Sequence, residues 1–174
     1  MDSVPPMSNL PTPAALIIVP SGGGESVHAF GTELLFHLTG KQTDGRNAVG
    51  TNIVPPHNPG PPPHFHERED EIFFVQDGRM AFLVDGTWQE VPEGSTVFAP
   101  KMSVHSLKNV GDAPARVLTA MVPAGFEVFF ARCAEEFAKS GAPDLARIVE
   151  ISAEHGIHYV KIPGTNDLLD PFIA

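Results

Sequence analysis

Short apolar runs separated by turn residues fill most of the chain. Between positions 72 and 122 these runs alternate with turn signals such as the two-residue Asp85-Gly86 and the triplet Pro92-Glu93-Gly94. Even spacing of this kind predicts a meander of short β-strands that closes into a sandwich or barrel. Three further strands are predicted upstream, at Ala15–Val19, Glu33–Leu38 and Ala48–Val54.

The hydrophobic period changes after Pro123-Ala124-Gly125. Apolar side chains then recur every three or four positions, which is the spacing of one helix face. They are Phe126, Phe129, Phe130, Cys133, Ala134 and Phe137. A second helix is predicted to begin at Pro143 and to end at a Gly156 cap. Both helices, within about residues 126–156, are expected to pack on the barrel.

A chain of 174 residues is long enough for one sizeable core. We therefore expect a single domain over residues 15–174, with the barrel at about 15–122. Residues 1–14 are predicted to form a flexible N-terminal arm, because Met1–Pro13 contains four prolines and little apolar periodicity. The predicted fold class is all-β with C-terminal helices.

The composition of the chain limits the classes of partner and the location that are expected for it. The formal net charge of −10, with no cluster of Lys or Arg, disfavours nucleic acid and anionic membrane surfaces as partners. The chain opens without a basic region, and its first apolar run is too short for a signal peptide or a membrane span. Cys133 is the only cysteine, so no internal disulfide forms and a cytoplasmic location is expected.

The segment Pro63-His64-Phe65-His66 holds two histidines in a stretch that the preceding prolines keep extended. Alternate side chains of a strand point to opposite faces, so His64 and His66 point the same way. Glu71 follows after a polar bend, has the parity of the run Glu71-Phe73-Val75, and is expected to reach the same face. His105, on a later strand, is a buried histidine that needs a partner.

Three imidazoles and one carboxylate suit a divalent first-row metal ion and leave coordination positions for water or substrate. We therefore predict one ion per chain on His64, His66, Glu71 and His105. Its identity stays open among Fe, Ni, Mn, Co, Cu and Zn.

Two spaced motifs carry a family resemblance: His64-x-His66-x4-Glu71-x6-Gly78, and Gly94-x5-Pro100-x-Met102-x2-His105-x3-Asn109. Together they resemble the signature motifs of the cupin superfamily, which implies a jelly-roll barrel with a metal inside. Met102 departs from the pattern, since the family usually has glycine there. Because Met tolerates a positive φ poorly, the loop is expected to use another turn type and to place Met102 at the pocket rim.

The short barrel with its C-terminal helix is similar to the quercetin-dioxygenase-like group. That resemblance implies a dioxygenase whose metal binds a deprotonated hydroxyl of a flavonol-like or enolisable small molecule, with Glu71 as the base and O2 as co-substrate. Two alternatives stay open: a non-oxidative metal-dependent isomerase, cyclase or decarboxylase, and a non-catalytic ligand-binding cupin.

Other side chains receive secondary predictions. No role is expected for His28, His57, His155 and His158, whereas His37 is a candidate for the cavity wall. An aromatic pocket is considered for Phe36, Phe73, Phe82, Trp88 and Phe98, although such residues in strands usually form core. Ile72 and Phe74 have the parity opposite to Glu71 and point out of the barrel, so a homodimer is expected to cover them.

Overall fold

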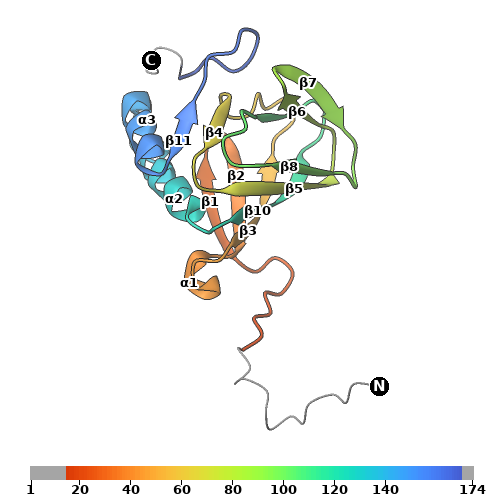
Figure 1. Cartoon of the computed structure of the whole chain (residues 1–174), viewed down its shortest axis with the longest axis vertical. Coiled ribbons are helices and arrows are strands. Elements are labelled where there is room, and N and C mark those ends of the chain that lie inside the picture. The colour runs from red at the N-terminus through yellow and green to blue at the C-terminus, as the bar shows by residue number, and fades with distance from the viewer. Residues whose placement is uncertain (1–14, 170–174) are drawn as a thin grey trace.

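The computed structural model describes residues 15–169, so the predicted arm at 1–14 lies outside the described residues. Strands form a barrel, and two helices pack along one side of it (Figure 1). The strands are β1 Glu25–Ala29, β2 Thr32–Leu38, β3 Ala48–Val54, β4 His64–His66, β5 Asp70–Asp77, β6 Met80–Val84, β7 Thr87–Val91, β8 Thr96–Ala99, β9 Leu107–Asn109, β10 Ala115–Val122 and β11 Ile157–Tyr159. The helices are α1 Gly40–Thr43, α2 Phe126–Phe137 and α3 Leu145–Glu154.

The barrel wall consists of antiparallel sheets. The largest has six strands in the order β1-β2-β3-β10-β5-β8, and a second has the order β7-β6-β9. A third sheet pairs β11 with β4, and an isolated bridge between His64 and His105 ties β4 to the segment before β9. This arrangement confirms the predicted jelly-roll barrel with C-terminal helices.

Turn chemistry sets the register of the β6-β7 hairpin. Asp85 and Gly86 have φ values of 49° and 74°, which both central residues of a type I′ turn require. The predicted meander from 72 to 122 is observed, although its last part is broken into the His105 bridge and the short β9.

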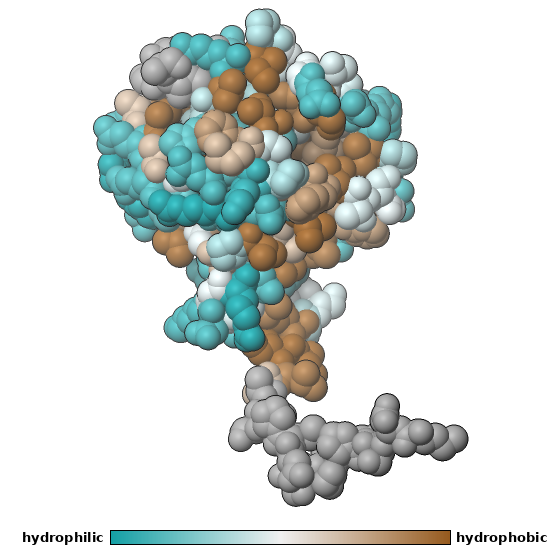
Figure 2. All heavy atoms as spheres, in the orientation of Figure 1, coloured by the Kyte–Doolittle hydropathy of each residue, from teal (hydrophilic) through white to brown (hydrophobic). Residues whose placement is uncertain are grey.

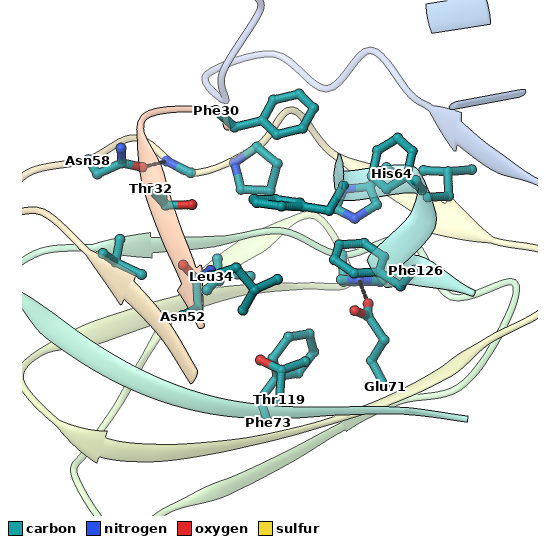
Figure 3. A pocket seen from close by; sticks show the side chains of 18 of the residues that line it. Phe30, Thr32, Leu34, Asn52, Asn58, His64, Glu71, Phe73, Thr119 and Phe126 are labelled. Atoms are coloured by element: carbon teal, nitrogen blue, oxygen red, sulfur yellow. Dashed lines mark hydrogen bonds and ion pairs between the residues drawn. The ribbon is translucent and has the colours of Figure 1, made fainter. Parts of the chain in front are cut away.

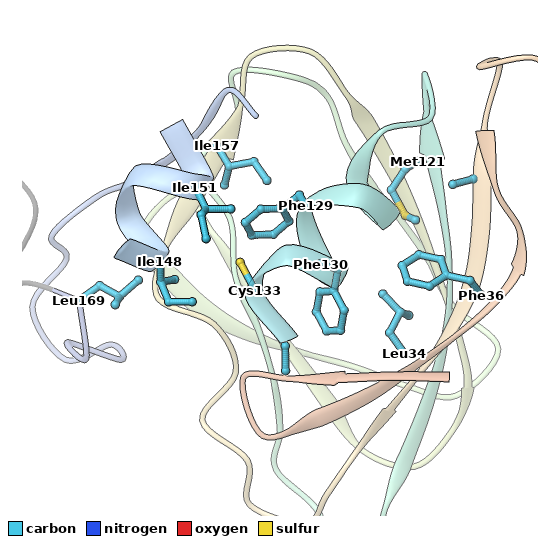
Figure 4. Close-up of a cluster of buried hydrophobic side chains, with 12 residues drawn as sticks. Leu34, Phe36, Met121, Phe129, Phe130, Cys133, Ile148, Ile151, Ile157 and Leu169 are labelled. Atoms are coloured by element: carbon cyan, nitrogen blue, oxygen red, sulfur yellow. The ribbon is translucent and has the colours of Figure 1, made fainter. Parts of the chain in front are cut away.

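Two clusters of buried side chains fill the molecule. The barrel interior holds Val54, Phe73, Val75, Met80, Phe82, Ala99, Leu107, Ala115 and Val117. The second cluster lies between the six-stranded sheet and the helices, where Phe129, Phe130 and Cys133 of α2 meet Ile148 and Ile151 of α3 (Figure 4). The apolar stripe predicted for the first helix therefore packs as core.

Some predicted elements differ from the structure. Ala15–Val19 forms no strand, because no neighbouring strand pairs with it, and Leu16 is 94% exposed. The second helix begins two residues later than predicted, since the Asp144 carboxylate accepts a hydrogen bond from the Arg147 amide and caps the helix. Gly156 lies just beyond its end with φ 76°, as its predicted role as cap requires.

Apolar side chains gather on the outside of the barrel at β5 and β8 (Figure 2). Ile72 and Phe74 are 41% and 39% exposed, which confirms that they point out of the barrel. Within the described residues, no helix is both long and apolar enough to span a bilayer.

Candidate metal centre

The two histidines of β4 point into the barrel. His64 and His66 are 7% and 1% exposed, whereas Phe65 between them lies on the opposite face and stacks on His158. The strand is held on both sides: β11 pairs with it along its length, and His64 exchanges backbone hydrogen bonds with His105. Strand parity therefore places both imidazoles as the sequence predicted.

Glu71 and His105 complete the cluster from two other segments. The Glu71 Oε2 atom lies 2.8 Å from Nε2 of His105 and 3.3 Å from Nε2 of His66. One side-chain nitrogen or oxygen from each of the four residues lies within 4.8 Å of all the others, and all four residues are buried. The structure thus brings together the four predicted ligands.

The other ring nitrogen of each histidine has an acceptor. Nδ1 of His64 lies 2.8 Å from the Pro62 carbonyl, and Nδ1 of His105 lies 3.0 Å from the Ser103 carbonyl. Nδ1 of His66 faces the Glu69 carboxylate at 3.4 Å. Because each Nδ1 has an oxygen acceptor, the three Nε2 atoms are the ones available to bind an ion.

The donor set fits a divalent metal ion. Nε2 of His66 is buried and makes no hydrogen bond among the described residues, although Oε2 of Glu71 lies 3.3 Å away, and this arrangement is costly unless an ion or ligand binds the nitrogen. Imidazole nitrogens and a carboxylate oxygen are the ligands that first-row divalent metals accept. The buried cluster can therefore hold one metal ion, whose identity the donor set leaves open.

Charge interactions shift the pKa values of these groups. Burial lowers the pKa of His64 well below 6.5, and the neighbouring His105 and His66 lower it further. Burial would raise the pKa of Glu71, but the surrounding histidines outweigh it and lower this pKa to about 2. Burial also opposes the charge of His105, yet the hydrogen bond to Glu71 raises its pKa.

Glu69 is a functional candidate that the sequence analysis missed. It lies in the polar bend between β4 and β5, but its side chain is buried and faces Nδ1 of His66. A carboxylate behind a ligating imidazole fixes the ring orientation and makes the ring a stronger donor. Nothing in the sequence from Glu67 to Asp70 distinguishes the buried Glu69 from the exposed Glu67 or the half-buried Asp70.

A cavity adjoins His64, Glu71 and His105 (Figure 3). The volume in which the centre of a water molecule fits is about 70 Å³. The cavity therefore has room for several waters or for a small substituted ring. Aromatic side chains from the turn after β1, from β5 and from α2 form much of its wall: Phe30, Phe73, Phe126, Phe129 and Phe130.

Most of the aromatic and histidine candidates for this wall are placed elsewhere. Phe73 lines the cavity as considered, but Phe36 and Phe82 are core, and Phe98 is 59% exposed on the outer face. His37 does not line it either, because its ring binds the Gly23 carbonyl and the Thr51 hydroxyl outside the barrel. The helix α2 supplies the packing that was expected, and it also supplies three of the five phenylalanines of the cavity wall.

The turn before His105 keeps the shape that a glycine would allow. Met102 has φ 67°, so the expectation of another turn type is wrong. Its amide donates a 2.7 Å hydrogen bond to the His66 carbonyl, which fixes the turn against β4. The Met102 side chain is 60% exposed and does not line the cavity, so the predicted place at the pocket rim is also wrong.

Residues 51–121 match the family model of the cupin domain (Cupin_2), and this range contains all four clustered residues. Solved structures share the fold. A Thermotoga maritima protein described as a predicted oxalate decarboxylase has a TM-score of 0.57 and 19% identity, over 62% of this chain and 99% of that one. The polyketide cyclase RemF of Streptomyces resistomycificus has a TM-score of 0.54 and 24% identity, over 62% of this chain and 80% of that one. The chain is thus similar to the cupin domain over residues 51–121, and it shares the barrel fold of these structures.

A further structural neighbour is the Streptomyces nucleoside dehydratase Pac13, with a TM-score of 0.53 and 14% identity over 66% of this chain and 88% of that one. Curated relatives match over shorter stretches. A Methanocaldococcus jannaschii uncharacterized protein is 30% identical over 60 residues, which are 34% of this chain and 48% of that protein. The probable oxidoreductase patJ of Aspergillus clavatus is 39% identical over 64 residues, 36% of this chain and 20% of that protein. The match thus spans less than half the length of either relative.

Proposed function

We propose that the protein is a metal-dependent enzyme of small-molecule metabolism, and specifically a dioxygenase of the quercetin-dioxygenase-like type. The observation that carries the proposal is the buried cluster of three histidines and Glu71 at the wall of an aromatic cavity. The size of the cavity favours an enolisable compound with a single ring over a flavonol with three.

A divalent ion on the four residues supplies a Lewis acid that lowers the pKa of a bound hydroxyl. Glu71 is the one acid among the described residues of the cavity wall, so it is the group placed to accept the hydroxyl proton. Its hydrogen bond from His105 is lost once His105 gives up the Nε2 proton, which frees the carboxylate for that task. The phenylalanine walls keep bulk water from the reacting atoms.

A non-oxidative isomerase, cyclase or decarboxylase is the second candidate. The same donor set serves Lewis-acid chemistry without O2, and a cyclase and a dehydratase are among the proteins with this fold. The third candidate function is that of a ligand-binding protein that converts no substrate, in which the metal only orders the barrel.

The experiment is oxygen uptake by the full chain after reconstitution with each candidate metal in turn. One-ring enols, catechols and β-diketones are offered in air and under argon, and the His105→Ala variant serves as the control without a complete site. Oxygen consumption with loss of substrate supports the dioxygenase. Equal turnover under argon overturns it in favour of the second candidate, and metal binding without turnover of any substrate favours the third.

A further inference from the structure

Two polar side chains on the cavity wall are without hydrogen-bond partners among residues 15–169. The Oδ1 atom of Asn52 is buried and unpaired, and Thr119 is 6% exposed with no hydrogen bond from its hydroxyl. The other polar wall residues outside the metal cluster are engaged: Thr32 donates to the Ala29 carbonyl, and Tyr159 bonds to Ser152. Asn58 likewise bonds to backbone groups through both amide atoms. Unpaired polar groups in an apolar wall are costly unless a ligand satisfies them.

Strand register places these two residues on one line leading away from the metal cluster. Glu71 of β5 is opposite Met121 of β10, and Thr119 comes two residues before Met121 on the same face. Asn52 of β3 is opposite Val117, a further two residues along β10. With a rise of about 3.3 Å per residue, Thr119 and Asn52 lie about 7 Å and 13 Å along the barrel from the level of Glu71. Figure 3 shows both in the wall, with Asn52 well removed from Glu71.

The charge of the wall limits what a ligand can carry at that end. No Lys or Arg lines the cavity among the described residues, and Glu71 is the one acid. A divalent ion with neutral imidazoles and the Glu71 carboxylate has a net charge of about +1, which one anionic oxygen balances. A ligand with a second negative group at the end far from the metal cluster would bury that charge without a cation, at a large desolvation cost.

We propose that Asn52 and Thr119 form a second recognition point, which hydrogen-bonds a hydroxyl or carbonyl of an uncharged one-ring substrate whose other end binds at the metal cluster. The inference rests on the proposed function, because it takes the cluster as the place where the substrate is anchored. It assigns the substrate class as a ring with an ionisable hydroxyl at one end and a neutral polar group at the other.

Three catechols with a common metal-binding end test this proposal: 4-methylcatechol, 3,4-dihydroxybenzyl alcohol and 3,4-dihydroxybenzoate. Their affinities for the zinc-loaded full chain are measured by titration calorimetry, and zinc is used because it is redox-inert. The benzyl alcohol is expected to bind about fivefold more tightly than the methyl compound, as one net hydrogen bond gives. The benzoate is expected to bind at least tenfold more weakly than the alcohol.

Substitutions that keep the shape of the wall assign the effect to the two residues. In Asn52→Leu and in Thr119→Val, the preference for the alcohol over the methyl compound is expected to fall, and in the double variant to vanish. Thr32→Val is the matched control, because it removes a hydroxyl from the same wall that already bonds within the chain. Its preference is expected to stay as in the wild type.

The outcomes separate this proposal from the function on which it rests. If the catechols bind only when zinc is present but without discriminating among their far groups, the recognition point is wrong and the proposed function stands. A preference that survives in the double variant also overturns the recognition point. If zinc makes no difference to the binding of any of the three, the metal-anchored substrate site itself is wrong, and the recognition point with it.

Discussion

The Nε2 atom of His105 lies 2.8 Å from Oε2 of Glu71, a contact between residues 34 positions apart in the chain. Nδ1 of the same ring lies 3.0 Å from the Ser103 carbonyl, which can only accept a hydrogen bond. Both ring nitrogens thus face acceptors, which favours an imidazolium with a proton on each nitrogen and agrees with the raised pKa of His105. An ion that binds Nε2 must displace that proton.

Metal affinity should consequently depend on pH with a slope of about one proton. The pKa of His105 is raised above 6.5. At pH values below this pKa, each further decrease of one pH unit should lower the zinc affinity about tenfold. His64 adds little to the slope because its pKa is lowered, and Glu71 stays ionised because its pKa is about 2. Calorimetry in buffers of different ionisation enthalpy counts the released protons at pH 6, and a count near zero contradicts the imidazolium.

Removal of one imidazole should empty the centre without unfolding the barrel. His105→Ala is expected to weaken zinc binding at least 100-fold, since the neighbouring Nε2 atoms then hold an ion through fewer bonds. The barrel should stay folded, because His105 belongs to neither apolar cluster and its link to His64 is through the backbone. Metal analysis and circular dichroism measure the two effects.

His57→Ala is the matched control, because His57 is exposed and pairs with Asp112 away from the centre. Full metal content in His105→Ala would show that this residue is not a ligand. Loss of metal in His57→Ala as well would mean that the losses reflect general damage.

Glu69 should matter for metal affinity although it is not one of the four ligands. Glu69→Gln is expected to weaken zinc binding by 10- to 100-fold, the usual cost of losing the acceptor behind a ligating histidine. Glu67→Gln is a close control, since Glu67 is an exposed acid two residues earlier that pairs with His158. Competition with a chromogenic chelator measures both, and equal affinities would leave Glu69 a purely structural role.

The sequence was sufficient for the parts of the site that depend on local rules. Alternation along β4 orients His64 and His66, and alternation along β5 turns Glu71 inward together with Phe73 and Val75. The hairpin at Asp85-Gly86 follows from the turn type that those two residues favour. Each of these features is decided within a few residues of chain.

Features that depend on distant contacts could not be predicted in this way. The three-residue strand β11 exists because it pairs with β4, about 90 residues earlier by its register, and Ile157-His158-Tyr159 has too little pattern to reveal that. The cavity wall likewise combines Phe30, from the turn after β1, with Phe126 of α2. The aromatic residues of the strands were the expected candidates for the cavity wall, but most of them lie in the core or on the outer face of the barrel.

The turn at Met102 offers a stability test. A residue other than glycine with φ 67° pays about 1 kcal/mol for the contact of its Cβ with the backbone. Met102→Gly is therefore expected to stabilise the metal-free protein by up to about 1 kcal/mol, since the exposed side chain loses little packing. Met102→Ala keeps the Cβ and should give no gain. Chemical denaturation measures both, and an equal gain from alanine would point away from backbone strain.

The apolar outer face of β5 and β8 leads to the last prediction, that two copies associate through it. Ile72 and Phe98 are opposite each other across the two strands, 41% and 59% exposed. Side chains of this size on a sheet face are typical of a protein interface, and burial of them gives a dimer much of its free energy.

We expect a dimer at micromolar concentration in sedimentation velocity, and a monomer for Phe98→Glu, because the carboxylate would be desolvated without a partner. Val84→Glu is the control, since Val84 is 37% exposed on the three-stranded sheet. Zinc content verifies that Phe98→Glu is folded, because Glu71 on the neighbouring strand faces inward. A wild-type monomer, or a dimer that Val84→Glu dissociates equally, would place the interface elsewhere.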